Sequence, residues 1–317
     1  MAQSDEIKVG ISACLLGEKV RYDGGHKLDP YLAGTLGRYV RFVPVCPEVE
    51  CGLPVPREAM RLEGDPGHPR LVTRHTRIDH TERMLAWAGR RVEELAREEL
   101  SGFIFKSRSP SSGMERVKVS TATGMARKGV GLFARELMRR LPLLPAEDEG
   151  RLQDPGLREN FIERLFVYRR WQQLLQESPG RGGLVGFHTE HKLMVLAHSP
   201  ERYRELGRLV AQAKEHGFGE LLAAYERLLM TALRLRATPR KNANVLQHLM
   251  GYFKKQLAPD EKQELLEVID QYRRELLPLI VPVTLVNHYV RKYGEDYLAR
   301  QWYLRSHPIE LKLRNHA

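Results

Sequence analysis

The sequence predicts an α/β N-terminal domain with a mostly parallel, Rossmann-like sheet, followed by an all-α C-terminal domain. Up to about residue 145, short β-rich runs alternate with amphipathic helical segments, a pattern typical of parallel sheets covered by helices. Farther along, apolar residues recur at i, i+3 and i+4, and strand signals are scarce. A chain of 317 residues is long enough for two domains. We therefore expect domains over residues 1–147 and 157–317.

In the first domain, strands and helices are expected to follow one another along the chain. The predicted strands cover residues 7–13, 39–45 and 102–107, and the predicted helices cover residues 80–100 and 129–144. Residues 52–74 are rich in Pro, Gly and Arg, so we expect a loop that crosses the edge of the sheet. Residues 144–156 are acidic and contain Pro and Gly, which predicts a linker.

The second domain is expected to contain about six or seven helices. Helical periodicity covers residues 159–176, 199–216, 218–235, 242–257 and 259–276. Several of these segments begin with Ser-Pro, Pro-Asp or Asn, which are helix-start signals. The segment FHTEHKLMVLAH carries three histidines, which we expect to be core or surface residues of one helix rather than metal ligands.

Composition and charge restrict the class of protein. The hydrophobic content of 42% suits a globular core, and no run approaches the roughly 18 apolar residues of a membrane helix. The N-terminus MAQSDEIKVG is polar and leads directly into a strand, so we expect no signal peptide, no membrane partner and a cytoplasmic location. The net charge of +11 suggests a polyanionic partner such as nucleic acid.

The three cysteines are the most informative residues of the chain. Cys14 follows the first predicted strand, and Cys46 and Cys51 follow the second, where each strand gives way to a Gly/Pro-rich loop. Ligands of open α/β sheets bind beyond the carboxyl ends of the strands, so we expect the cysteines to converge at one edge. Three is an odd and low number, which argues against a disulfide scaffold.

Three thiolates without a fourth suit an iron–sulfur cluster with one iron free to bind a substrate atom. A structural zinc site would prefer four ligands, and no CxxC motif or nearby Cys/His pair supplies them, so zinc is the weaker alternative. Burial as small core residues is a further alternative, above all for Cys14. The third strand also ends in a polar loop, which the topology places at the same edge and which contains Lys106, Ser107, Ser109, Ser111, Ser112 and Gly113.

Three ordered motifs, ISACLLGEKVRYDGGHK, CPEVECGLPVPR and KSRSPSSG, resemble the thiouracil desulfidase (TudS) family over roughly residues 5–145. In the helical half, GFHTEHKLMVLAHSPERYRELG and TPRKNANVLQHLMGYFKKQL resemble the helical domain that is fused to such modules in RNA desulfidases (RudS). Those fusion proteins remove sulfur from 4-thiouridine in tRNA. The resemblance therefore implies an Fe–S-dependent tRNA 4-thiouridine desulfidase.

The resemblance also implies roles for individual residues. The cofactor would be a [4Fe-4S] cluster held by three cysteines, with one open iron that takes the thiocarbonyl sulfur. Cys14 and Cys46 would be ligands, and Glu48 and Ser109 would assist catalysis. The single-domain relatives typically carry a cysteine ligand where this chain has Ser112, and Gly-Gly where it has Cys51 and a glycine. We expect Cys51 to replace the missing ligand.

The implied reaction is hydrolysis of a C–S bond without net electron transfer, so no nicotinamide or flavin is expected. Water would attack the ring carbon, Glu48 would move the proton, and Ser109 would hold the base or the water. The products are uridine and sulfide. Further pocket candidates are Tyr22, Asp23, Arg57, Lys106, Ser111 and Ser112.

The helical half offers candidate contacts to tRNA phosphates, although each could simply belong to a solvated helix face. These candidates are Lys192, Arg240, Lys241, Lys254, Lys255, Arg291 and Lys292. Two other functions remain open: desulfuration of free thiolated bases such as thiouracil, and RNA binding by a protein whose cluster is structural. The last function predicts a fully ligated cluster and tolerance of Glu48→Gln.

Overall fold

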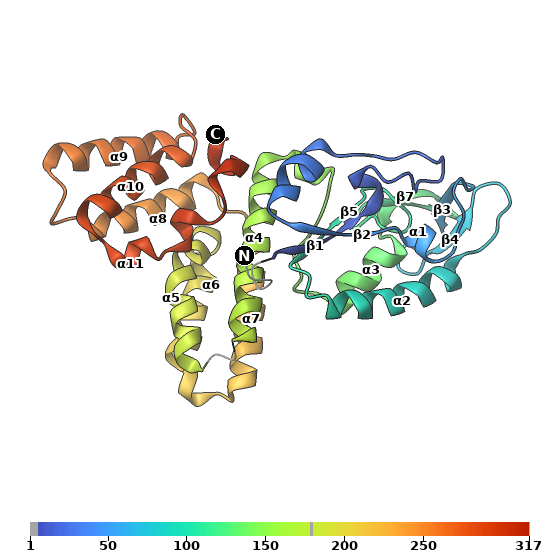
Figure 1. Cartoon of the computed structure of the whole chain (residues 1–317), viewed down its shortest axis with the longest axis horizontal. Helices are drawn as coiled ribbons and strands as arrows, with labels where there is room; N and C mark the ends of the chain where they lie inside the picture. Colours follow the sequence, from blue (N-terminus) through green and yellow to red (C-terminus); the bar gives the residue numbers. More distant parts are fainter. Residues whose placement is uncertain (1–5, 178–179, 317) are drawn as a thin grey trace. The chain divides into compact units, whose positions relative to one another are not determined.

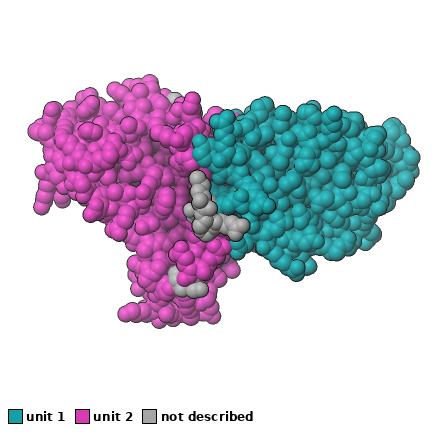
Figure 2. Space-filling view, viewed as in Figure 1, with its two compact units in different colours: residues 1–153 teal, residues 154–317 magenta. Residues whose placement is uncertain are grey.

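A computed structural model describes residues 6–177 and 180–316. The chain divides into two compact units, Met1–Gln153 and Asp154–Ala317, which Figure 2 shows in teal and magenta. The expectation of no signal peptide rests partly on residues 1–5, which lie outside the described residues.

Unit 1 is built on a parallel four-stranded sheet with the order β2-β1-β5-β8, of which Figure 1 labels β1, β2 and β5. The strands are β1 (Lys8–Ser12), β2 (Arg41–Val45), β5 (Gly102–Phe105) and β8 (Ala146–Asp148). Two helices, α2 (Thr81–Arg97) and α3 (Leu132–Arg140), pack against each other. The Phe133 ring lies 5.3 Å from Trp87 and 5.6 Å from Phe103, centroid to centroid, so α3 meets both α2 and the sheet. The predicted α/β class is confirmed.

A second four-stranded sheet was not expected from the sequence. Its order is β4-β3-β6-β7, from β3 (Met60–Glu63), β4 (Arg70–Thr73), β6 (Val117–Thr121) and β7 (Gly124–Gly129). The prediction of a simple loop over residues 52–74 is therefore wrong, because β3 and β4 lie within it. The predicted linker is also wrong in part, because residues 146–148 form β8 of the first sheet. These strands are short and rich in charge, so their apolar alternation is too brief to recognise.

Short helical segments connect the strands of unit 1. They are η2 (Ala13–Leu16), the π-helical η3 (Tyr31–Thr35), η4 (Leu36–Arg38), α1 (Pro47–Glu50) and η5 (Arg151–Gln153). Two of them, η2 and α1, begin directly after β1 and β2, at the edge where the strands end. They therefore determine where the first two cysteines lie.

Unit 2 is helical, as expected. The main helices are α4 (Pro155–Gln176), α5 (Arg181–His198), α6 (Pro200–Ala211), α7 (Phe218–Leu233), α8 (Pro239–Tyr252), α9 (Pro259–Arg273) and α10 (Ile280–Tyr293). Shorter elements follow them or lie between them, namely η6 (Ala213–Glu215), α11 (Asp296–Ala299), η7 (Trp302–Arg305), η8 (Ile309–Leu311) and η9 (Leu313–Asn315). Asp154, Ser199 and Thr238 cap α4, α6 and α8, each just before a proline, which is the helix-start pattern seen in the sequence.

The histidines of α5 are core residues, as predicted. His188, His191 and His198 are all buried. The Nδ1 atom of His188 lies 3.2 Å from the Tyr225 hydroxyl, and burial lowers the pKa of His188 to about 4, with help from the nearby Lys192. These rings therefore serve packing and hydrogen bonding within the unit. In the described part of the chain, no helix combines the length and apolar character needed to cross a membrane.

Candidate functional site

A cavity of about 390 Å³ lies at the edge where the strands of the parallel sheet end. Its wall contains Cys14 from η2, Cys46 at the end of β2, Glu48 from α1, and Ser109 and Ser112 from the loop after β5. The strands run parallel, so the segments that follow them emerge at one edge. The topology thus brings together three loops that are far apart in the sequence.

Cys14 and Cys46 present buried thiols to this cavity. Burial raises the pKa of Cys14 to about 11 and that of Cys46 to about 12. The Cys46 Sγ lies 3.6 Å from the Glu48 carboxylate, which also raises its pKa. A thiol with a raised pKa is protonated at neutral pH, whereas metals bind the thiolate. Loading a metal cluster onto these two residues would therefore release protons.

Cys51 is also buried but does not line the cavity wall. It ends the single turn of α1, and its Sγ donates to the Glu48 carbonyl at 3.3 Å. In the third loop, Ser112 lines the cavity at the position where a cysteine was expected in relatives. Two thiols thus fit a soft metal cluster in this cavity, while the third thiol, at the C-terminal end of α1, is not part of the cavity wall.

A chain of hydrogen bonds connects the third loop to Glu48. The Ser111 hydroxyl donates to the Glu48 carboxylate at 2.5 Å, and the hydroxyls of Ser109 and Ser111 lie 3.0 Å apart. Because the Ser111 proton is used toward Glu48, the Ser109 hydroxyl must donate to Ser111. Ser111 was expected only as a pocket residue. It is the bridge between the two residues predicted to assist catalysis.

The N-terminus of α3 holds this serine loop in place. The backbone N–H groups of Phe133 and Ala134 donate to the Ser111 carbonyl at 3.0 and 3.2 Å. The first N–H groups of a helix have no partner within the helix, so they are available to bind such a carbonyl. At Gly131, an added Cβ would lie 2.4 Å from the carbonyl carbon and oxygen of Ser111. The position of the serine loop therefore depends on a glycine, Gly131, at the start of α3.

Gly131→Ala should displace the serine loop. The added Cβ would clash with the backbone carbonyl of Ser111, which can move only if the loop moves. We therefore expect a loss of about 1–3 kcal/mol in unfolding free energy and a drop in turnover. Denaturant unfolding and steady-state kinetics measure both. Gly89→Ala is the matched control, because nothing lies within 4 Å of its added Cβ in the middle of α2. That variant should be as stable as wild type or more stable by up to about 1 kcal/mol.

Four of the six further pocket candidates line the cavity. They are Tyr22, Arg57, Lys106 and Ser112, whereas Asp23 and Ser111 do not line it. Arg57 lies 3.7 Å from the Glu48 carboxylate and donates to two backbone carbonyls, so it fixes the wall. The Lys106 ammonium forms an ion pair with the Glu149 carboxylate, so Lys106 is less available to a ligand.

Sequence reasoning missed four cations at this cavity: Arg21, Lys27, Arg74 and Arg108. Arg21 pairs with Asp23 at 3.5 Å, whereas the other three are exposed and, within the described residues, have no hydrogen bond or ion pair through their side chains. Arg108 has a φ of 60°, a left-handed conformation that non-glycine residues adopt uncommonly. Glu48 is the one carboxylate among the described lining residues. The cavity mouth therefore favours an anionic ligand.

In unit 2, some of the side chains predicted to contact phosphates have partners within the protein, and others are exposed. The Lys241 ammonium donates to the carbonyls of His198 and Arg236 at 2.8 and 3.1 Å, and Lys292 is paired with Glu261 at 2.5 Å. Those two lysines have partners within the unit, and their role as phosphate contacts stays a prediction. Lys192 lies over the Tyr297 ring, 5.1 Å from its centroid. The remaining candidates are exposed: Arg240, Lys254, Lys255 and Arg291.

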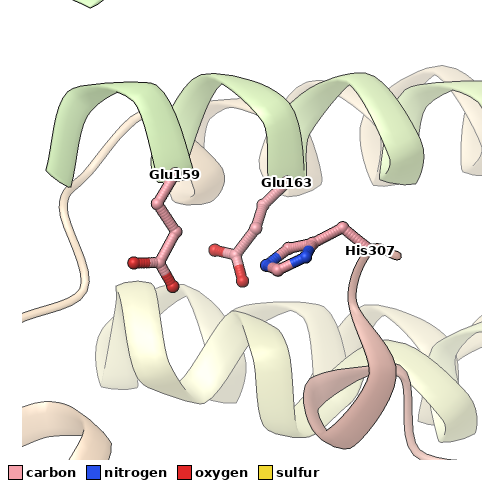
Figure 3. Close-up of side chains that lie close together, drawn as sticks. All are labelled: Glu159, Glu163 and His307. Atoms are coloured by element: carbon pink, nitrogen blue, oxygen red, sulfur yellow. The ribbon is translucent and has the colours of Figure 1, made fainter. Parts of the chain in front are cut away.

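Unit 2 also contains an acidic cluster of Glu159, Glu163 and His307, whose possible ligand atoms lie within 4.8 Å of one another (Figure 3). Arg314 already neutralises this cluster: its Nη2 lies 2.8 Å from Glu163, and its Nε lies 3.3 Å from Glu159. His198 lies 3.3 Å from Glu163 on another side. The cluster is thus a buried ion-pair network rather than a vacant cation site.

Arg314→Met should destabilise unit 2 strongly. It would leave the buried Glu163 without its main counter-charge, and breaking a buried pair in this way costs about 3–5 kcal/mol. Urea unfolding measures the loss. Arg291→Met is the control, because this exposed arginine has no side-chain partner among the described residues and should change stability by less than about 0.5 kcal/mol. Equal effects of the two variants would contradict the assignment.

Comparisons with known proteins divide the chain in the same way. Residues 9–149 match a family model described as 2-thiouracil desulfurase, and residues 192–308 match one described as a protein of unknown function, DUF1722. The uncharacterized protein YbgA of Escherichia coli (strain K12) is 33% identical over 158 residues, which cover 50% of this chain and 94% of that protein. A solved structure, the [4Fe-4S]-dependent thiouracil desulfidase TudS, is 30% identical and covers 47% of this chain and 95% of its own, with a TM-score of 0.40.

Proposed function

Since this chain belongs to the family of YbgA and, over residues 9–149, to the 2-thiouracil desulfurase family, we propose that it is a tRNA 4-thiouridine desulfidase. The reaction is the non-redox hydrolysis of a C–S bond, with uridine and sulfide as products. The proposed cofactor is a [4Fe-4S] cluster, which the related thiouracil desulfidase uses according to its description.

The observation that carries this proposal is the meeting of two thiols and a proton relay at one cavity. Cys14 and Cys46 line the wall, and the Ser109–Ser111–Glu48 chain ends 3.6 Å from the Cys46 Sγ. A desulfidase needs both a soft metal to take sulfur and a group that moves protons to and from water. Both requirements are met by residues from the three sequence motifs.

When bound, the cluster would supply a Lewis-acidic iron that polarises the thiocarbonyl. The residues of the chain supply the rest. Glu48 would accept the proton of the attacking water, and Ser111 would keep its carboxylate oriented at 2.5 Å. The Ser109 oxygen accepts from the N–H groups of Ser111 and Ser112, so its own proton is directed along the relay. Arg57 lies 3.7 Å from the Glu48 carboxylate and would help to hold it in place.

We assign the three cluster ligands to Cys14, Cys46 and Cys51. Cys51 is the remaining cysteine of the chain, and Ser112 takes the place of a thiol in the third loop. Because Cys51 caps α1 next to Gly52, which has a φ of 88°, a local rearrangement at this end of α1 would turn its thiol toward the cavity. Its bond to the Glu48 carbonyl is the contact that must be given up.

A nucleotide in RNA suits the cavity mouth better than a free base. Lys27, Arg74 and Arg108 offer charge that a neutral thiouracil would leave unused. The 4-thiouridine would have to turn out of its stack to reach the cavity, as bases do in other enzymes that modify nucleic acids. The helical unit, with its exposed arginines and lysines, would hold the rest of the tRNA.

The test is to incubate anaerobically purified, cluster-loaded protein with tRNA that contains 4-thiouridine, then digest the RNA and quantify nucleosides. Loss of 4-thiouridine with a matching gain of uridine is the expected result. Parallel incubations with free 4-thiouridine and with thiouracil distinguish the substrates. Turnover of thiouracil alone would replace the tRNA proposal with the free-base function, and no turnover with an intact cluster would refute the catalytic one.

A further inference from the structure

The β6–β7 hairpin of the second sheet carries a compact group of free cations. Lys118, Arg127 and Lys128 are exposed on it, whereas Val117 and Val119 are buried beneath. A β-bulge places two residues, Arg127 and Lys128, opposite the single Lys118. Cross-strand neighbours lie about 5 Å apart, so the three cations form one cluster, the basic hairpin patch.

The basic hairpin patch is not neutralised by the protein. Over the described ranges 6–177 and 180–316, none of its three side chains has a hydrogen-bond or ion-pair partner. The nearest carboxylate by strand register is Glu63 on β3, opposite Ser120. It is already bound by Arg61 at 2.5 Å and by Arg77 at 2.6 Å. Like-charged groups left together at a surface cost stability unless an anion covers them.

In the second sheet, the pairing of β6 with β3 places the basic hairpin patch close to the cavity. Leu62 of β3 pairs with Val119 of β6 in parallel, so Met60 lies level with Val117, and Met60 lines the cavity. A Cβ on Gly113 would lie 2.5 Å from the Val117 side chain, which ties the start of β6 to the serine loop. Lys118, the exposed residue that follows Val117 on β6, is thus one position from the level of the cavity wall.

We propose that the basic hairpin patch binds backbone phosphates of the RNA whose nucleotide occupies the cavity. This inference rests on the proposed RNA substrate. A free base carries no phosphate for the patch to bind, so the patch favours a polynucleotide whose backbone continues past the cavity over a free base. Three unpaired cations in one cluster suit phosphates, which proteins bind through Lys and Arg without regard to sequence. The catalytic unit then grips RNA by itself, next to the reacting base.

The test compares the full-length wild type with a Lys118→Gln, Arg127→Gln, Lys128→Gln variant. Binding of tRNA without any thiouridine is measured over a range of salt concentrations. The log–log slope of affinity against salt should become shallower by about 2–3, since each duplex phosphate contact contributes about 0.9. The matched control removes three charges elsewhere in unit 1, at the exposed Arg38, Arg90 and Arg97. Its slope should stay near that of the wild type.

Each outcome decides the inference. A wild-type slope in the hairpin variant, with an unchanged melting curve, would overturn it and leave an acidic protein as the partner to seek. Equal losses in the hairpin and control variants would also overturn it, because total charge rather than the patch would then govern binding. The RNA carries no thiouridine, so failure of desulfuration would refute the proposed function without changing this result.

Discussion

Replacing Glu48 by glutamine should slow desulfuration of 4-thiouridine by about 10²- to 10⁴-fold, the usual contribution of a general acid or base. Glutamine preserves the size of the side chain and an acceptor for Ser111, but it cannot take a proton from water. Its amide would also direct a donor toward the Arg57 guanidinium, which now lies 3.7 Å from a carboxylate oxygen. Iron and acid-labile sulfide content should stay at the wild-type level, because the two thiols at the cavity wall are untouched.

The matched control for this result is Glu18→Gln. Glu18 is an exposed carboxylate in the same unit, and it does not line the cavity. It should turn over substrate at the wild-type rate. If Glu48→Gln also did so with the cluster intact, Glu48 would have no part in proton transfer, and the cluster would become a structural element of an RNA-binding protein.

The parallel sheet could be predicted because its two central strands, β1 and β5, are buried on both faces along almost their whole length. Gly102–Phe105 is buried throughout, and such continuous apolar runs bounded by loops are strong signals. The second sheet could not be predicted, because Gly124–Gly129 is mostly exposed, shows no apolar alternation and forms a strand only by pairing with β6. The same holds for β8, a strand of three residues within an acidic segment.

The candidate site was predictable as a meeting of loops but not as a network. Cysteines and a glutamate after two predicted strands predict a shared edge, because parallel strands end together. Sequence spacing carries no information on which serine bridges Ser109 and Glu48, since that depends on how α3 holds the Ser111 carbonyl. Nor could it reveal that Arg74, which directly follows a strand that was not predicted, belongs to the cavity mouth.

Cys14→Ser and Cys46→Ser should each abolish cluster binding, leaving little of the about four irons per chain that a [4Fe-4S] cluster contains. Both thiols line the cavity, and serine is a poor ligand for iron at neutral pH because its hydroxyl does not ionise there. Iron and acid-labile sulfide analysis after anaerobic reconstitution measures the loss without reference to turnover. Retention of a full cluster in either variant would contradict its assignment as a ligand.

Cys51→Ser is the decisive variant of this series, because its thiol now donates to the Glu48 carbonyl instead of lining the cavity. If Cys51 is the third ligand, this variant should lose the cluster as the other two do. Adding Ser112→Cys to it should then restore iron binding, because residue 112 is buried at the cavity wall, where a thiol would serve the same iron. A Cys51→Ser variant that keeps a full cluster would instead make Cys51 a core residue and require a non-thiolate third ligand.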